Sequence, residues 1–149
     1  MLMKLTFIGA DHEVTGSCHF LEVGDTKVLI DCGMEQGNNP YQNAELPVSY
    51  SDIDYVFLTH AHIDHAGMLP WIYARGFKGQ IITTYATADL CGIMLRDSAH
   101  IQEMEAEWKN RKARRAGNPE VQALYTVNDA EGVLKHFVPC HYGDILTIC

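Results

Sequence analysis

Hydrophobic and polar residues alternate over much of the first third of the chain, which is the pattern of strands with one buried face. A Gly24-Asp25 pair separates two of these segments and favours a tight hairpin turn. We therefore predict strands over Lys4–Gly9, Ser17–Val23 and Thr26–Ile30. The following segment, 34–51, contains prolines, a glycine and asparagines, and it predicts a long loop of the kind that often serves function.

Beyond residue 51, short apolar runs separate longer segments with helical character. Pro70 falls in the first turn of one helical segment, where proline is tolerated, and Thr84 or Thr87 can cap the longest one. We predict strands over Asp54–Thr59, Gln80–Thr83, Phe137–Cys140 and Asp144–Cys149, and helices over Gly67–Arg75, Ala88–Arg115 and Asp129–His136. This order predicts an α/β (α+β layered) fold with a mixed β-sheet flanked by helices.

The composition fits one globular domain. The chain has 149 residues, of which 47% are hydrophobic and 20% charged, which excludes disordered, collagen-like and coiled-coil classes. No window approaches about eighteen consecutive apolar residues, and the N-terminus does not resemble a secretory signal, so we expect neither membrane insertion nor export. The five cysteines are widely spaced and form no Cys-x-x-Cys pair, which predicts free thiols in a reducing cytoplasm.

Three of the eight histidines fall within six residues, in the segment His60-Ala61-His62-Ile63-Asp64-His65. Residues two apart in extended backbone point to the same side, so we expect His60 and His62 to face one metal ion. Asp64 and His65 follow at the turn into the next helix and can reach a second ion about 4 Å away, as in two-metal hydrolases. Imidazole and carboxylate ligands favour Zn²⁺, with Mn²⁺ or iron as alternatives.

Asp31 directly follows the apolar run Val28-Leu29-Ile30. A carboxylate at the end of a buried strand needs a polar partner. One interpretation is a residue that orients the metal loop by accepting hydrogen bonds from its ligands. The alternative is a turn residue, because Asp31-Cys32-Gly33 also favours a turn.

The chain resembles a known family in several segments. Asp31-Cys32-Gly33 and the segment from His60 to Gly67 resemble the first two motifs of the metallo-β-lactamase superfamily. Other segments resemble its β-CASP branch, which includes RNA 3′-end-processing endonucleases: Glu13–Cys18, Ala86–Leu90, Met94–Glu103 and Leu124–Ala130. The histidine motif is specific to the superfamily, whereas the other segments indicate the branch less strongly.

The resemblance implies a dinuclear zinc hydrolase that cuts phosphodiesters in RNA. It implies an αββα sandwich with the metal ions at one edge, and a metal-bridging hydroxide as the nucleophile. By match to the motif, His60 and His62 would bind one zinc ion, and Asp64 and His65 the other. Catalytic roles then fall to Asp64 and His65, with Asp31 orienting them.

The chain departs from the family pattern, because the later motifs do not occur before Cys149. A third histidine, a metal-bridging aspartate, a final histidine and the β-CASP insertion are missing, so each ion has only two ligands. His12 is a candidate replacement ligand. We therefore expect residues 1–149 to form a partial metallo-β-lactamase domain, namely the N-terminal half of the sandwich, either from a longer protein or from a truncated product. Such a half-sandwich would expose one apolar face.

A basic run near the end of the long predicted helix has two interpretations. It contains five of the eleven basic residues: Lys109, Arg111, Lys112, Arg114 and Arg115. Acidic residues precede it, so it fits a solvated helix end whose charges complement the helix dipole. It is also compatible with a patch that contacts RNA phosphates, although the net charge of −8 argues against a general nucleic-acid coat.

Three functions remain open from the sequence. The first is an RNA nuclease of the β-CASP type, with RNA as its partner. The second is a metallo-hydrolase of a lactone, thioester or β-lactam, and the third is an inactive fragment. A homodimer that completes the site is also compatible with the sequence. For the 149 residues alone, we expect weak zinc binding and negligible hydrolysis.

Overall fold

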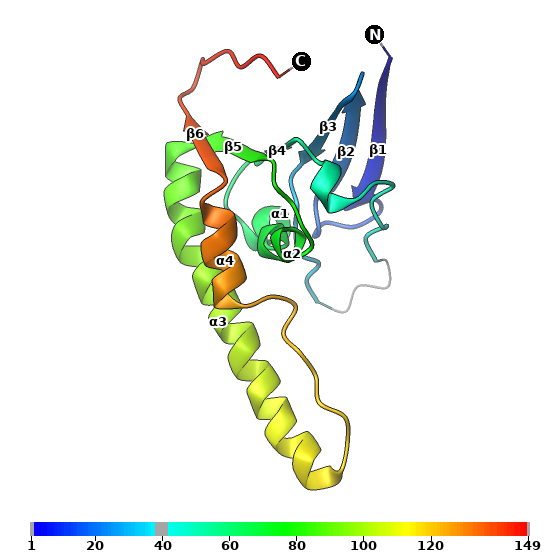
Figure 1. Ribbon diagram of the computed structural model, residues 1–149, viewed down its shortest axis with the longest axis vertical. Helices are drawn as coiled ribbons and strands as arrows, with labels where there is room; N and C mark the ends of the chain where they lie inside the picture. Colours follow the sequence, from blue (N-terminus) through cyan, green and yellow to red (C-terminus); the bar gives the residue numbers. More distant parts are fainter. Residues whose placement is uncertain (1, 38–41, 149) are drawn as a thin grey trace.

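The computed structural model describes residues 2–37 and 42–148. One sheet of six strands runs through the molecule, and its strand order equals the sequence order (Figure 1). The strands are β1 (Met3–Gly9), β2 (Cys18–Val23), β3 (Thr26–Ile30), β4 (Tyr55–Phe57), β5 (Gln80–Thr84) and β6 (Phe137–Cys140). The predicted α/β fold with a mixed sheet is thus confirmed.

The sheet has an antiparallel part and a parallel part. β1, β2 and β3 pair antiparallel, and Gly24 adopts a positive φ of 60° in the predicted hairpin turn between β2 and β3. β3, β4, β5 and β6 then pair parallel. Because parallel strands point the same way, the residues that follow β3 and β4 emerge at the same edge of the sheet.

Four helices connect the parallel strands: α1 (Ile63–Ala66), α2 (Leu69–Ala74), α3 (Tyr85–Ala116) and α4 (Val127–Leu134), and η1 (Tyr50–Asp52) is a 3₁₀ turn before β4. Thr84 caps α3, where its hydroxyl accepts from the Thr87 amide. Thr126 and Asp129 form a reciprocal capping box, which starts α4 two residues earlier than the sequence predicts. The predicted helix Gly67–Arg75 is shorter, and α1 precedes it.

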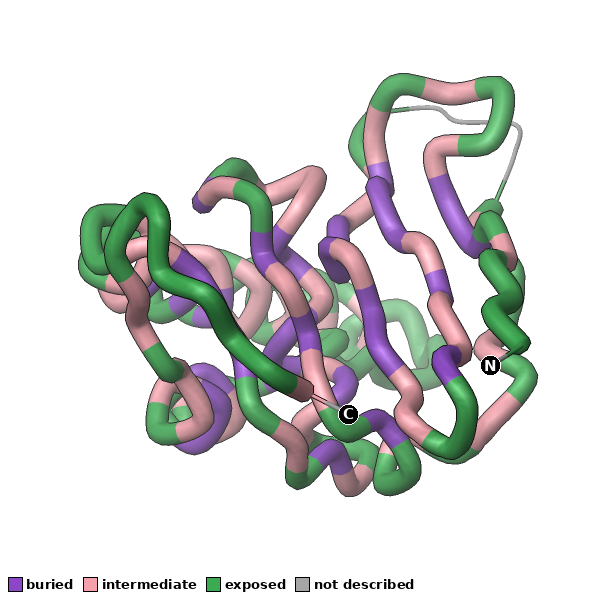
Figure 2. The backbone as a smooth tube through the Cα atoms, turned by 90° about the horizontal axis from the view of Figure 1, so that it is seen from above, coloured by how far each residue is buried: buried purple, intermediate pink, exposed green. Residues whose placement is uncertain are grey.

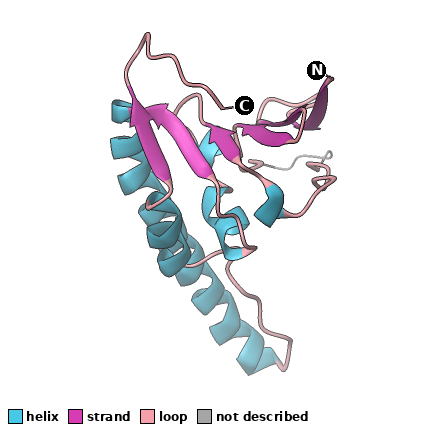
Figure 3. Cartoon of the chain, turned by 45° about the horizontal axis from the view of Figure 1, so that its top comes forward, coloured by secondary structure: helices cyan, strands magenta, loops and turns pink. Residues whose placement is uncertain are grey.

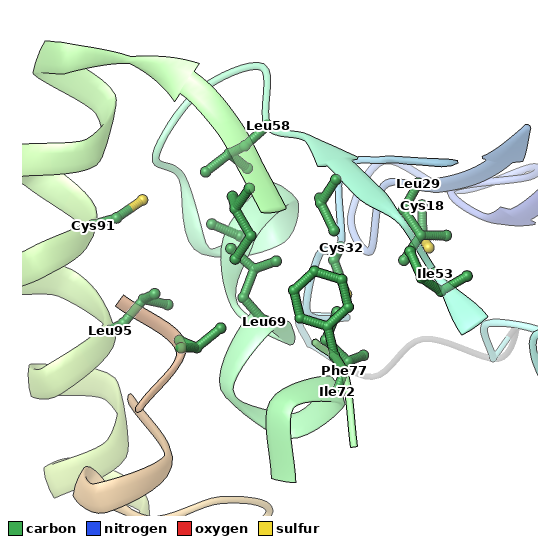
Figure 4. Close-up of a cluster of buried hydrophobic side chains, with 14 of the residues drawn as sticks. Cys18, Leu29, Cys32, Ile53, Leu58, Leu69, Ile72, Phe77, Cys91 and Leu95 are labelled. Carbon is green, nitrogen blue, oxygen red and sulfur yellow. The ribbon is translucent and has the colours of Figure 1, made fainter. Parts of the chain in front are cut away.

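The main core lies between the sheet and the helices, which gather on one face of the sheet (Figure 3). Its sheet side includes Phe20, Leu29 and Ile81, and its helix side includes Leu69 and Leu95. Figure 4 shows the side chains of α2 and α3 pointing toward those of the strands. On the edge strand β1, Met3, Leu5 and Phe7 are exposed, and their register pairs them with β2 residues of the face opposite Phe20.

The predicted strand at Asp144–Cys149 is wrong for residues 144–148, and Cys149 lies outside the described residues. After β6, a turn with Gly143 at φ 88° redirects the chain, and the following segment is exposed almost throughout (Figure 2). Ile145 is 94% exposed. Apolar residues alone do not make a strand, because a strand also needs a neighbour for its backbone hydrogen bonds.

No helix in the described ranges is both long and apolar enough to cross a membrane. The four described cysteines are free thiols, as predicted: Cys18, Cys32, Cys91 and Cys140.

Two helical glycines provide a matched test of the packing between α2 and α4. A Cβ on Gly132 would lie 2.3 Å from the Tyr73 ring, whereas a Cβ on Gly92 would meet only the flexible Arg96 guanidinium at 3.6 Å. We expect Gly132→Ala to lower the free energy of unfolding by about 1–3 kcal/mol. Gly92→Ala should leave it unchanged or raise it by about 0.4–1 kcal/mol. Urea unfolding measures both, and equal stabilities of the two variants would contradict this packing.

Candidate metal centre

The predicted ligand segment begins three residues after β4 and ends inside α1. Leu58 still donates a backbone hydrogen bond to Ile82 of β5, so the chain leaves the sheet at Thr59. His62 is the N-cap of α1, with extended φ and ψ of −62° and 148°. Asp64 and His65 lie in the single turn of α1. The sequence analysis placed Asp64 and His65 at the turn into a helix that begins at Gly67, whereas both already lie in a helical turn of their own.

The three imidazole rings of the segment lie together. The His60 ring centroid is 4.6 Å from that of His62 and 4.0 Å from that of His65. The Asp64 carboxylate is 3.6 Å from Nε2 of His65. The side chains of Asp64 and His65 are 20% and 23% exposed, so both retain access to solvent. Each of the four candidate ligands thus lies next to at least one other.

Asp31 sits beneath this cluster with its side chain only 4% exposed. Its Oδ1 accepts from the Thr59 amide at 2.9 Å. Its Oδ2 accepts from Nδ1 of His65 at 2.7 Å and from the hydroxyls of Thr59 and Ser17 at 3.0 and 3.2 Å. Four donors compensate for the burial of the carboxylate. Asp31 therefore joins the start of β2, the end of β3 and the ligand segment.

These contacts select one tautomer for each of two histidines. An ionised carboxylate accepts only, so Nδ1 of His65 must carry the proton that it donates to Asp31. The Thr59 hydroxyl donates its one hydrogen to Asp31. Nδ1 of His60, 2.9 Å away, must therefore donate to the Thr59 oxygen. Each imidazole, when neutral, then presents the lone pair of Nε2. Nε2 is the atom with which such histidines bind metal ions.

The backbone around Asp31 permits a close approach that larger residues would prevent. A Cβ on Gly33 would lie 1.7 Å from the carbonyl oxygen of Asp64. The Ser17 amide donates to that oxygen at 2.8 Å, and the Cys32 amide donates to the carbonyl of His65 at 2.7 Å. Asp31 itself has a left-handed φ of 60°, a conformation that aspartate tolerates better than most residues. Two neighbouring backbones therefore hold the ligand segment in place.

The donor set fits zinc in kind, with three imidazoles and one carboxylate. Within residues 2–37 and 42–148, however, no three His, Cys, Asp or Glu side chains are gathered closely enough to hold a metal ion together. The assignment of two ligands to each ion therefore stays a prediction. His12, the candidate replacement, lies in the loop after β1 with its side chain 80% exposed and Nε2 3.7 Å from Asp11.

Sequence reasoning missed Ser17 and Thr59, the two hydroxyl partners of Asp31. Ser17 lies within the Glu13–Cys18 segment, and Thr59 directly precedes His60. Hydroxyl residues are common in turns, and their role becomes visible only when β2, β3 and β4 are paired. Neither could be identified from spacing along the chain.

The basic run lies at the end of α3, and most of its charges have acidic neighbours. Lys109 and Arg111 are 3.8 and 3.5 Å from Glu105 and Glu107, and Arg114 is 2.7 Å from Glu120. Nζ of Lys112 lies 3.6 Å from the Trp108 ring centroid. No carboxylate of the described residues is within ion-pair distance of Lys112 or Arg115. Arg114 and Arg115 occupy the last turn, as the helix-dipole interpretation requires.

Several curated proteins are similar to this chain. Ribonuclease TTHA0252 of Thermus thermophilus is 34% identical over 98% of this chain and 30% of its own length. Transcription termination factor FttA of Methanocaldococcus jannaschii is 31% identical over 95% of this chain and 20% of its own length. Cleavage and polyadenylation specificity factor 73 of Drosophila melanogaster is 31% identical over 90% of this chain and 18% of its own length. The chain thus spans less than a third of each relative.

Among solved structures, the metallo-beta-lactamase fold protein YhfI from Bacillus subtilis is 27% identical, with a TM-score of 0.43 over 58% of this chain and 38% of that protein. A family model described as "Metallo-beta-lactamase superfamily" matches residues 13–144. The matched range includes Asp31 and all four candidate ligands. The relatives with RNA-processing names agree with the predicted resemblance to the β-CASP branch. The chain therefore belongs to the metallo-β-lactamase superfamily.

Proposed function

We propose that this chain carries half of the metal site of a zinc-dependent RNA phosphodiesterase of the β-CASP type. One observation carries the proposal. Asp31 and Thr59 occupy Nδ1 of His65 and His60 with hydrogen bonds, so Nε2 of each histidine stays available for a metal ion. The choice of RNA is supported by relatives named as a ribonuclease and as a cleavage and polyadenylation specificity factor. Those names favour RNA over a lactone, thioester or β-lactam as the substrate.

In this proposal, His60 and His62 hold one zinc ion, and Asp64 and His65 hold the other. Bound zinc supplies a water of lowered pKa and charge stabilisation for the phosphodiester. The chain's own contribution is orientation. Asp31 fixes the tautomer and direction of His65, and Thr59 transmits the same constraint to His60.

Two protein ligands for each ion are fewer than the three that catalytic zinc usually has. We therefore propose that residues outside the segment 60–65 supply the remaining ligands, in the same protein or in a partner chain. Residues 1–149 would then be part of a larger metallo-β-lactamase domain. We place this activity in the cytoplasm, where the described free thiols would stay reduced.

Removal of the metal is the direct test of this function. We expect a chelator to lower RNA cleavage by the native protein by at least about 100-fold, because bound zinc stabilises charge in the transition state by several kcal/mol. Added Zn²⁺ should restore the activity, while the melting temperature reports whether the chelated protein stays folded. Full cleavage by a folded protein shown to contain no metal would contradict the proposal.

We also propose that the end of α3 contributes modestly to RNA binding, through the two basic residues without acidic neighbours. Lys112→Ala together with Arg115→Ala should weaken binding about threefold and reduce the slope of log K against log salt by about 1. Lys109→Ala together with Arg111→Ala is the matched control, because Glu105 and Glu107 already offset these charges. An equal loss in both double variants, measured by fluorescence anisotropy, would show that the ion pairs do not matter.

A further inference from the structure

Two thiols lie together directly behind the candidate metal centre. Cys18 and Cys32 are 6% and 4% exposed, and their side chains hydrogen-bond to each other. Both belong to the main core and point to the helix side of the sheet (Figure 4). The other two described cysteines lie elsewhere, Cys91 buried in α3 and Cys140 at the end of β6. Cys18 and Cys32 are thus the pair placed to react with each other.

The position of the pair is set by strand pairing. His19 faces Ile30 across β2 and β3, so Cys18 and Cys32 lie at the same end of this antiparallel pair. Each cysteine follows a residue of the site, since Ser17 precedes Cys18 and Asp31 precedes Cys32. The Ser17 carbonyl accepts from the Gly33 amide at 2.8 Å, and the Ser17 hydroxyl donates to Asp31 at 3.2 Å. The two backbones are therefore already fastened side by side.

A cavity gives small molecules a route to both sulfurs. Cys18 and Cys32 line a space of about 450 Å³, together with Ile8, Leu29, Tyr50 and Trp71. Glu35, Asn43 and Glu45 also line it, so a small uncharged oxidant can enter this largely apolar space, whereas a bulky or anionic one is disfavoured. The hydrogen bond from Cys18, together with burial, raises the pKa of Cys32 well above its usual value.

We propose that Cys18 and Cys32 are a redox-modification site, at which hydrogen peroxide converts the two thiols into a disulfide that ties β2 to the end of β3. Peroxide first oxidises the Cys18 sulfur to a sulfenic acid and releases one water. The Cys32 sulfur then attacks the Cys18 sulfur, and the hydroxyl leaves as a second water with the Cys32 proton. Two thiols and one peroxide thus give one disulfide and two waters.

The disulfide would act on the ligand segment through two hydrogen bonds. The Ser17 amide holds the carbonyl of Asp64, and the Cys32 amide holds the carbonyl of His65. A covalent bond draws the two sulfurs closer than a hydrogen bond does, so it displaces both backbones from their present positions. The displacement weakens both amide hydrogen bonds and changes the direction of the ligands. The consequence for zinc affinity, unlike the disulfide itself, rests on the proposed function.

Peptide mapping of the peroxide-treated protein tests the disulfide directly. Trypsin cuts after Lys27, between the two cysteines, so the expected product is a linked pair of peptides, 5–27 and 28–75. The mass of this linked pair should be lower by two hydrogen atoms than the summed masses of the two reduced peptides. The pair should separate into those two peptides on reduction. Hydrogen exchange of the Ser17 and Cys32 amides should become about tenfold faster in the oxidised protein. Absence of the linked pair while Cys140 is oxidised would overturn the proposal, as would unchanged exchange in a protein that carries the link.

Variants separate this site from the other thiols and from the metal function. We expect oxidation to weaken zinc binding about tenfold in the native protein and in Cys140→Ser. Oxidation should have no effect on zinc binding in Cys32→Ala or in Cys18→Ser. If one of these two control variants folds poorly, the other can be used alone. A linked protein with unchanged zinc affinity would refute the coupling. If the reduced protein bound no zinc, the proposed function would fail, while the linked peptides and amide exchange would still decide the thiol proposal.

Discussion

Alanine in place of Asp64 should lower RNA cleavage by the native protein by about 10³-fold, which corresponds to about 4 kcal/mol of transition-state stabilisation. Asp64 is the only carboxylate of the ligand segment, and it lies 3.6 Å from Nε2 of His65. Removing it leaves the second zinc ion of the proposed site with one ligand from this segment. A zinc ion with so few ligands is bound weakly and placed poorly, so both hydroxide generation and charge stabilisation are lost.

RNA binding by the Asp64→Ala protein should stay within about threefold of the native value, because phosphate contacts supply most of the binding energy. Asp89→Ala is the matched control, since Asp89 is an exposed carboxylate on α3. Single-turnover cleavage and anisotropy separate the two effects. Turnover near the native rate in a well-folded Asp64→Ala protein would exclude the two-metal assignment.

The largest expected loss of stability is that of Asp31→Ala, at about 3 kcal/mol in the free energy of unfolding. The substitution removes the common acceptor of four donors, among them the part-buried Thr59 amide and the buried Ser17 hydroxyl. It also removes the acceptor that keeps the proton of His65 on Nδ1. Zinc affinity should therefore fall by about 10- to 100-fold. Urea unfolding and zinc titration measure the two losses separately.

Asp31→Asn is the conservative counterpart. Asparagine also tolerates the left-handed φ of 60°, and its oxygen can still accept from Thr59. Its amide group cannot accept from Nδ1 of His65, so we expect about half the loss of stability but a similar loss of zinc affinity. Native zinc affinity in Asp31→Asn would show that Asp31 supports the fold without orienting His65.

Local patterns predicted most of the fold, because most of its elements are encoded locally. The alternation in 4–9 and the turn at Gly24 fixed β1, β2 and β3 to within a residue. The Thr84 cap was among the two expected, and α3 begins directly after it. The prediction failed at 144–148, where apolar residues follow a left-handed glycine and no neighbouring strand receives them. A strand at 144–148 would need a neighbouring strand, and the residues of the segment itself do not show whether one is present.

The sequence offered the candidate ligands of the site but not the residues that support them. Spacing identified His60, His62, Asp64 and His65, because those residues are neighbours in the chain. The sequence left Asp31 open between an orienting residue and a turn residue, and its contacts with His65 and Thr59 favour the orienting role. The hydroxyls of Ser17 and Thr59 come from different strands. Their convergence is a property of the sheet register, and it could not be read from spacing.

The strand order has a consequence for the way this chain can fold during synthesis. Each strand pairs with the strand made immediately before it, so a growing chain always offers a completed edge to the next strand that leaves the ribosome. Within residues 2–37 and 42–148, no strand has to be inserted between two earlier ones, and only β6 is separated from its partner by a long segment, which contains α3 and α4. The hydrogen bonds from Ser17 and Thr59 to Asp31 can form once β4 and Thr59 have emerged. The ligand segment thus emerges directly after the strands that position it and before the long helix α3.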